Sequence, residues 1–334
     1  MKIKHCMLAL TAVCTILAAP LTGWAAPAAP DVTAEAAYMV NANTGEALYT
    51  KHADEEIYPG STTKIMTCVL GLEMGKDKLN QPIKITNDSL NLTDASVLGL
   101  YPGDQVTLRN AMTGMMLVSG CDAAVDVAET VAPTQADFVK AMNTKAAALG
   151  MTHTHFANPH GLPDPDHYSS ARDLAKIAVY AMNLPEFRSM VSRSTYEMPY
   201  INGSTKHCVS TNKFLTSGFA GANGIKTGTT NAGGACLVAS ATQDGNTLIA
   251  VVLKSDDRFG DARKLLKYGF DQFPKENVYI TRDVLLQQEA DKQAVQTAQT
   301  AQTAQAANNQ AAPASAVISS QHITPTAAAT QKTA

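Results

Sequence analysis

Two serines in this chain are each followed three residues later by a lysine: Ser61 by Lys64, and Ser210 by Lys213. Residues three apart on a helix share a face, so the lysine amine can take the proton of the serine hydroxyl. The amine acts as a base only where burial or a nearby cation lowers its pKa. Ser61 follows a Pro-Gly turn and precedes an apolar helical run, whereas the stretch around Ser210 is polar. We therefore interpret Ser61 as a nucleophile, Lys64 as its base, and the chemistry as acyl transfer through a serine ester.

A second group of chemical residues is the run Lys226-Thr-Gly-Thr229, which directly precedes a predicted hairpin. As an edge strand, this run offers free backbone donors and alternating side chains to a ligand. The amine of Lys226 and the hydroxyls of Thr227 and Thr229 are suited to bind a carboxylate. Gly228 lacks a Cβ and lets an extended peptide approach the backbone closely. The run predicts a binding strand for a peptide that ends in a carboxylate.

Two β-hairpins are predicted, one near each end of the folded part. Residues 37–40 and 47–50 flank a cluster of turn formers, and residues 235–242 and 247–253 flank Gln243-Asp-Gly-Asn246. Hairpins at both ends favour a single antiparallel sheet built from both.

The segments between the hairpins carry apolar residues at helical spacing. These helices must cover the sheet, and the long middle part predicts a helical lobe with a groove between lobe and sheet edge. The expected helices are residues 63–73, 108–117, 123–131, 135–149, 171–182 and 261–273.

The two ends of the chain are unlike the middle. Residues 1–25 combine a basic start, a short apolar run and small residues before Ala26, which is the pattern of a secretory signal peptide and too short for a membrane anchor. Residues 287–334 repeat Gln, Thr and Ala, which predicts a disordered tail. We expect a catalytic domain at residues 32–282, a secreted protein and no stable membrane anchor.

Charge and cysteines narrow the function further. The formal net charge is −3, and removing Lys2 and Lys4 with residues 1–25 leaves 24 basic against 29 acidic side chains, which argues against a nucleic-acid partner. Four cysteines remain after that removal, and none lies in a CxxC pair, so a structural zinc site is not expected. Their disulfide state stays open, although two lie in apolar runs and are expected in the core. The four are Cys68, Cys121, Cys208 and Cys236, with Cys68 and Cys236 in the apolar runs.

The stretch Met115-Met-Leu-Val-Ser-Gly-Cys-Asp-Ala-Ala124 resembles the second motif of a known family. Low-molecular-mass penicillin-binding proteins, which are serine-type D-alanyl-D-alanine carboxypeptidases, commonly read Ser-Gly-Asn-Asp-Ala-Ala there, between the Ser-x-x-Lys and Lys-Thr-Gly motifs. The resemblance extends over residues 32–273. The further matching segments are Tyr58-Pro-Gly-Ser-Thr-Thr-Lys-Ile-Met-Thr67, Met142-Asn-Thr-Lys145, Leu149-Gly-Met151, Asn158-Pro-His-Gly-Leu-Pro163, His167-Tyr-Ser-Ser-Ala-Arg-Asp-Leu174 and Gly224-Ile-Lys-Thr-Gly-Thr-Thr230.

This resemblance implies a β-lactamase/transpeptidase-like fold of the α/β (α+β) class and a set of roles. Ser61 attacks the bond between two D-alanines of a peptidoglycan stem peptide, Ser119 passes a proton to the leaving D-alanine, and backbone N–H groups of Ser61 and Thr229 form the oxyanion hole. Lys226, Thr227, Gly228 and Thr229 bind the substrate's end. β-Lactam antibiotics acylate the same serine, no metal or cofactor is needed, and the protein works in the cell envelope.

Two features depart from the family's pattern. Cys121 stands where the family usually has an asparagine that binds the substrate amide and the active-site lysine, and a thiol is a weaker donor and acceptor. Cys121 as a redox-sensitive site is an alternative. The Gln/Thr/Ala tail resembles neither the β-rich second domain nor the amphipathic membrane helix of many relatives.

Other functions remain as alternatives. A β-lactamase would need an added base, and no glutamate lies in residues 158–170, where class A enzymes carry theirs. A DD-endopeptidase uses the same chemistry, and a non-catalytic peptidoglycan-binding protein would keep the groove alone. The histidines of the chain's loops are expected to make polar contacts there, and zinc binding is the alternative. Arg172 and Asp173 are expected to make a structural ion pair or cap. The histidines are His153, His155, His160 and His167, with Asp164 nearby.

Overall fold

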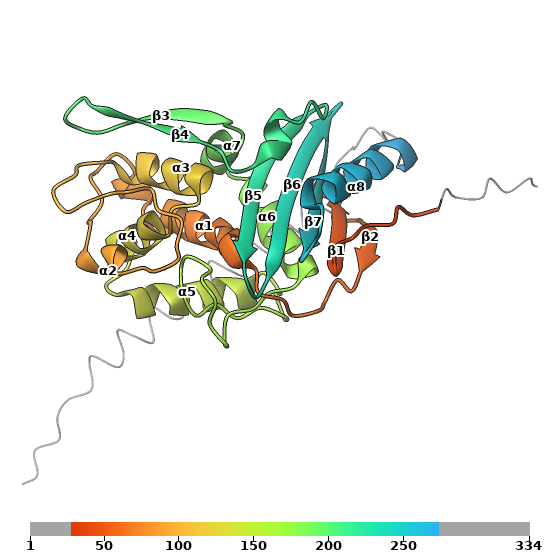
Figure 1. Cartoon of the computed structure of the whole chain (residues 1–334), viewed down its shortest axis with the longest axis horizontal. Helices are drawn as coiled ribbons and strands as arrows, with labels where there is room; N and C mark the ends of the chain where they lie inside the picture. The colour runs from red at the N-terminus through yellow and green to blue at the C-terminus, as the bar shows by residue number, and fades with distance from the viewer. Residues whose placement is uncertain (1–27, 274–334) are drawn as a thin grey trace, which may run out of the picture. The chain divides into compact units, whose positions relative to one another are not determined.

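The computed structural model of the chain describes residues 28–273 (Figure 1). The predicted signal peptide at residues 1–25 and the predicted tail at residues 287–334 lie outside the described residues, as does the C-terminal end of the predicted domain at 32–282. Those boundaries therefore stay predictions.

A five-stranded antiparallel sheet forms from both ends of the described chain, as the hairpin pattern predicts. Its order is β2-β1-β7-β6-β5, so the N-terminal hairpin pairs with the C-terminal one through β1 and β7. The motif Lys226-Thr-Gly-Thr229 lies in β5, which is the edge strand expected. The strands are β1 (Ala36–Asn41), β2 (Ala47–Lys51), β5 (Ala222–Thr230), β6 (Gly234–Gln243) and β7 (Asn246–Leu253).

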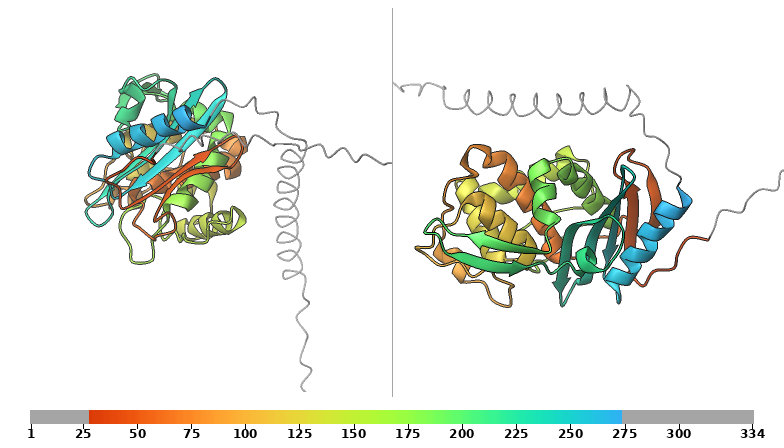
Figure 2. Two further views of the ribbon diagram at one scale, coloured as in Figure 1. Left: turned by 90° about the vertical axis from the view of Figure 1, so that its right-hand side faces the viewer. Right: turned by 90° about the horizontal axis from the view of Figure 1, so that it is seen from above.

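Both faces of this sheet are covered by helices. On β7, Ile249 and Val251 pack into the larger core beneath the helical lobe, while Leu248 and Ala250 pack into a smaller core beneath α8 (Arg258–Gln272). The alternation follows from the two-residue period of a strand. Figure 2 shows α8 in blue on one side of the sheet and the lobe on the other.

The helical lobe positions the first two motifs. A 3₁₀ turn, η1 (Gly60–Thr63), leads into α1 (Lys64–Met74), and α3 (Leu108–Val118) is followed almost at once by α4 (Cys121–Val131). The lobe also contains α5 (Gln135–Ala148), and α6 (Ala171–Met182) packs on β1 and β7. Side-chain caps start several of these helices, since their first N–H groups need acceptors. The caps are Thr107 for α3, Thr134 for α5, Ser170 for α6 and Asp257 for α8.

Several elements were not expected from the sequence. The largest is a separate two-stranded hairpin, β3 (Thr195–Pro199) paired with β4 (Thr205–Val209), which packs on α3. Its buried face carries little more than Met198 and Cys208, so the apolar pattern is faint. The short segments α2 (Asn87–Leu90), α7 (Pro185–Val191), η2 (Lys76–Lys78) and η3 (Lys213–Thr216) were also missed.

Candidate active site

The predicted nucleophile and base lie together at the start of α1. Lys64 Nζ is 3.0 Å from Ser61 Oγ and 2.7 Å from the carbonyl oxygen of His160. Lys64 is fully buried, and burial is the main cause that lowers the pKa of its amine below the usual 10.5, against smaller opposing effects of Cys121 and Asp122. A lowered pKa favours the neutral amine, which can accept a proton.

The second motif supplies a hydroxyl at the junction of α3 and α4. Ser119 adopts the left-handed conformation, with φ 67°, which ends α3 and directs the chain into α4. Lys226 Nζ, carried by β5, lies 3.0 Å from Ser119 Oγ and 2.9 Å from the carbonyl oxygen of Thr227. Burial, followed by the nearby charge of Lys64, lowers the pKa of Lys226 well below its usual range. The second and third motifs are thus joined by a direct contact.

Cys121, in the second motif, is buried against the lysine of the first motif. Its Sγ lies 3.3 Å from Lys64 Nζ, and its backbone N–H donates to the carbonyl of Ser96 at 2.7 Å. The thiol therefore contacts the active-site lysine, as the family's asparagine was expected to do. The next residue, Asp122, accepts hydrogen bonds from the backbone N–H groups of Leu98, Gly99 and Leu100, and so holds the neighbouring loop against α4.

Gly228 also has a structural reason that was not predicted from the sequence. A Cβ at this position would lie 2.6 Å from the carbonyl oxygen of Pro59 and 3.2 Å from the backbone nitrogen of Ser61. The close approach is therefore that of the turn carrying Ser61 to β5. A Cβ on Gly60 would lie 3.2 Å from the backbone nitrogen of Thr229, from the other side of the same contact. The two backbone nitrogens expected to form the oxyanion hole come from these two touching segments.

The hydroxyls of Thr227 and Thr229 lie on the other face of β5 from Lys226, as strand alternation requires. Arg258, the first residue of α8, donates to Thr229 Oγ1 at 2.7 Å and to the carbonyl oxygen of Gly228 at 2.8 Å. The prediction missed this half-buried guanidinium. The only sequence clue was a cation at the start of the helix that follows the second hairpin.

The histidines named from the sequence contact neighbouring residues of the fold. His167 Nδ1 accepts from the N–H of Ala157, so its Nε2 carries the proton toward Thr63 Oγ1 at 2.8 Å. Burial lowers the pKa of His160 to about 3 and that of His167 to about 4. His155 Nδ1 contacts the carbonyl of Asp166, and His153 Nδ1 lies 3.7 Å from Glu56. Within residues 28–273, no group of three His, Cys, Asp or Glu side chains is arranged to hold a metal ion.

The remaining sequence candidates have structural environments. Arg172 makes a two-pronged ion pair with Asp54, and Asp173 accepts from Thr154 and pairs with Lys176, as a structural role predicts. Ser210 accepts a hydrogen bond from the N–H of Asn212 in a loop. All four cysteines of the described chain are free, and Cys68 and Cys236 are buried in the core as expected.

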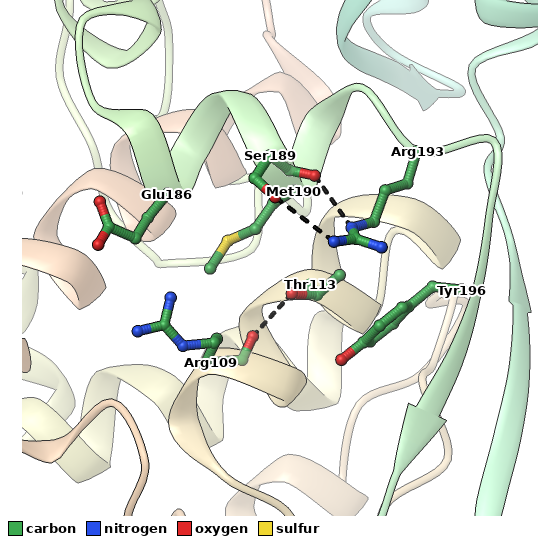
Figure 3. Close-up of a pocket in the computed structure, with 7 residues that line it drawn as sticks. All are labelled: Arg109, Thr113, Glu186, Ser189, Met190, Arg193 and Tyr196. Atoms are coloured by element: carbon green, nitrogen blue, oxygen red, sulfur yellow. Dashed lines mark hydrogen bonds between the residues drawn. The ribbon is translucent and has the colours of Figure 1, made fainter.

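A separate surface pocket lies between α3, α7 and β3 (Figure 3). Within it, Arg193 donates to the backbone and hydroxyl oxygens of Ser189 and stacks on Tyr196. None of the three motifs contributes a residue to this pocket. The candidate active site is therefore the motif cluster, where two buried lysines and two hydroxyls meet.

The comparisons with known proteins identify the family and the fold. Residues 24–257 match the peptidase S11 family, described as D-alanyl-D-alanine carboxypeptidase. The chain belongs to this family. The family expected from the motifs is thereby confirmed, and with it the expectation that the chain belongs to a class of serine-type enzymes.

Two curated relatives in the family show how much of the chain is shared. The D-alanyl-D-alanine carboxypeptidase of Streptomyces sp. (strain K15) is 38% identical over 281 residues, which are 78% of this chain and 94% of that protein. The carboxypeptidase DacF of Bacillus subtilis is 34% identical over 256 residues, which are 74% of this chain but only 64% of that protein. The chain thus spans less than two thirds of DacF and nearly all of the Streptomyces protein.

Solved structures confirm the expected fold. The Streptomyces K15 DD-transpeptidase is 38% identical, with a TM-score of 0.68 over 73% of this chain and 99% of that chain. Penicillin binding protein 5 from Haemophilus influenzae is 33% identical, with a TM-score of 0.68 over 73% of this chain and 72% of that chain. The transpeptidase-like α+β architecture is therefore shown.

Proposed function

We propose that this protein is a serine-type D-alanyl-D-alanine carboxypeptidase that removes the terminal D-alanine from peptidoglycan pentapeptides through an ester on Ser61. The observation that carries the proposal is the paired contact of two buried lysines with two serine hydroxyls, Lys64 with Ser61 and Lys226 with Ser119. Membership of the peptidase S11 family supports it.

In the proposed acylation step, Ser61 Oγ forms a bond to the carbonyl carbon between the two D-alanines. Lys64 takes the hydroxyl proton, and the carbonyl oxygen gains negative charge that backbone N–H groups of Ser61 and Thr229 stabilise; one such donor typically contributes about 3–4 kcal/mol. The carbon–nitrogen bond then breaks, and the leaving nitrogen receives a proton through Ser119. Water hydrolyses the ester in a second step and regenerates Ser61.

The end of β5 suits a free carboxylate, which would make the enzyme a carboxypeptidase. Thr227 and Thr229 present hydroxyls, and Arg258 adds a guanidinium that reaches Thr229 Oγ1 at 2.7 Å. Burial favours the neutral form of the Lys226 amine, and a bound carboxylate favours its protonated form again. Lys226 then contributes a positive charge from the face of β5 that contacts Ser119. Arg258 thus joins the substrate-binding residues predicted from sequence.

The partners and location follow from the same proposal. A β-lactam presents a strained amide and a carboxylate in the same relative positions, so it should acylate Ser61 and leave slowly. Peptidoglycan is outside the cytoplasmic membrane, so the proposal places the protein in the cell envelope as a secreted enzyme. No helix among residues 28–273 is both long and apolar enough to cross a bilayer.

The test combines a fluorescent penicillin with a synthetic pentapeptide ending in D-Ala-D-Ala. We expect a stable adduct on Ser61, located by mass spectrometry, together with D-alanine release, and neither in Ser61→Ala. Ser210→Ala, which removes the serine of the other Ser-x-x-Lys match, should keep the adduct.

Other outcomes would favour the alternative functions. Rapid turnover of the drug would indicate a β-lactamase, and cleavage of cross-linked dimers without D-alanine release would indicate an endopeptidase. No adduct and no release from a folded protein would indicate a binding protein and refute the proposal.

A further inference from the structure

The loop between β4 and η3 reaches the third motif through one side chain. Thr211 Oγ1 lies 2.7 Å from Thr227 Oγ1, and the N–H of Thr211 donates to the carbonyl oxygen of Leu117 at 3.0 Å. Leu117 lies two residues before Ser119 on α3. Thr211 is thus attached to the second motif by its backbone and to the third by its hydroxyl. It is the second residue of Ser210-Thr-Asn-Lys213, the Ser-x-x-Lys match that was not assigned to the site from the sequence.

The loop is built to hold Thr211 in place. The N–H of Ser210 donates to the carbonyl of Ser194 at 2.8 Å, which fixes one side. On the other side, Asn212 is buried and its side chain accepts from the N–H of Phe214, whose ring is fully buried. The position of the Thr211 hydroxyl is therefore set by packing and hydrogen bonds on both sides of it.

The contact with Thr227 has a direction that matters for binding. A hydroxyl has one proton, so Thr227 can donate to a carboxylate only when it does not donate to Thr211. If Thr211 donates to Thr227, the Thr227 proton is free to point at the ligand, and the two bonds strengthen one another. Thr211 can thus hold Thr227 in the rotamer and proton orientation that a carboxylate requires.

We propose that Thr211 is a positioning residue for carboxylate recognition, acting through Thr227. The inference rests on the proposed function, since it concerns the ligand group which Thr227 is proposed to bind. It adds a further chain segment, outside the three motifs and Arg258, to the machinery that recognises the substrate's free end.

A double-mutant cycle tests this role with the pentapeptide substrate. Thr211→Val removes the hydroxyl with little change in shape, and we expect it to raise KM about fivefold with kcat nearly unchanged, the size of one net hydrogen bond. Thr211→Ser keeps the hydroxyl and should restore KM. In a Thr227→Val background, Thr211→Val should add no further effect, because the group through which it acts is gone.

The controls separate this inference from the proposed function. Thr216→Val removes an exposed hydroxyl from the adjacent η3 and should leave KM unchanged. Thermal melting of each variant shows that it is folded. Additive effects of the Thr211 and Thr227 changes, or no rescue by Thr211→Ser, would overturn the role of Thr211 while leaving the carboxypeptidase intact. A wild type that neither releases D-alanine nor binds penicillin covalently would instead refute the proposed function.

Discussion

Lys226 Nζ reaches Ser119 Oγ at 3.0 Å across 107 residues of sequence, and Ser119 is held with a positive φ. A non-glycine residue in the left-handed region costs roughly 1–2 kcal/mol of strain. We infer that this strain is retained because the proposed reaction needs the Ser119 hydroxyl, at the junction of α3 and α4, to pass a proton to the leaving nitrogen.

Ser119→Gly separates strain from chemistry. Glycine adopts the positive φ freely, so the variant should melt at or above the wild-type temperature, while its rate of acylation by penicillin falls by about 10²-fold or more. Calorimetry and stopped-flow labelling measure the two effects. A variant that is destabilised as well as slow would show that Ser119 mainly supports the fold.

Cys121→Asn should leave D-alanine release unchanged or raise it. The amide oxygen of asparagine is a better acceptor than the thiol for the Lys64 amine 3.3 Å away, and its N–H can also donate to the substrate. Steady-state kinetics on the pentapeptide measure the change, with Cys208→Asn in the β3–β4 hairpin as a control for the general cost of a buried asparagine. A complete loss of activity in folded Cys121→Asn would contradict our account of the second motif.

The rate of acylation should rise with pH as Lys64 loses its proton. Burial lowers the pKa of Lys64 below 10.5, so the midpoint of the rise should lie below that value. Lys64→Arg cannot deprotonate and should slow acylation by about 10²–10⁴-fold at every pH. Lys140→Arg, on the exposed face of α5, should reproduce the wild-type profile. A Lys64→Arg enzyme with the same pH profile would rule out Lys64 as the base.

Arg258→Leu should weaken carboxylate recognition. A charged hydrogen bond typically contributes about 1.5–3 kcal/mol, so kcat/KM for the pentapeptide should fall by about 10-fold or more. Arg263→Leu, on the same helix, removes a guanidinium that bonds the carbonyl of Ser217 and should leave kcat/KM unchanged. Equal losses in both variants would mean that net charge, and not the contact with Thr229, carries the effect.

Asp126→Asn should stabilise the domain above pH 7. Asp126 is fully buried in α4, one oxygen accepts from the N–H of Thr86, and the other has no hydrogen-bond partner among the described residues. Burial raises the pKa of this carboxyl to about 7, so the stability it contributes when protonated is lost as pH rises from about 4 to about 7. At pH 8 the variant should gain on the order of 2–4 kcal/mol in the free energy of unfolding, and at pH 3, below both pKa values, almost nothing. Denaturant melts at both pH values measure this gain, with the exposed Asp77→Asn as control. An equal gain at both pH values would exclude titration of Asp126 as the cause.

The parts of the fold that the sequence predicted are those with strong local patterns. The second hairpin was clear because an Asp-Gly turn separates two apolar runs, and the long helices were clear from apolar spacing. The β3–β4 hairpin was missed although Asn202-Gly203 forms its turn, because its outer face is polar. Glu197 and His207 are examples of exposed residues there.

The active site was predictable where the residues form motifs and hidden where they do not. Ser61, Lys64, Ser119 and Lys226 were found because spacing and family resemblance identify them. Arg258 and Thr211 make contacts that exist only in the folded chain, between segments that no local pattern links. The reason assigned to Gly228 was incomplete for the same cause, since its neighbour is the turn at Pro59, far away in sequence.

The packing of glycines around Ser61 limits how this enzyme can change. A methyl group on Gly228 would meet the carbonyl of Pro59 at 2.6 Å, and one on Gly161 would meet that of Gly60 at 2.0 Å. If β-lactams acylate Ser61 as proposed, resistance substitutions selected in bacteria should therefore avoid Gly228 and Gly161. An inhibitor that binds the backbone atoms beside Gly60, Gly161 and Gly228 would contact the part of the protein where substitutions are least tolerated.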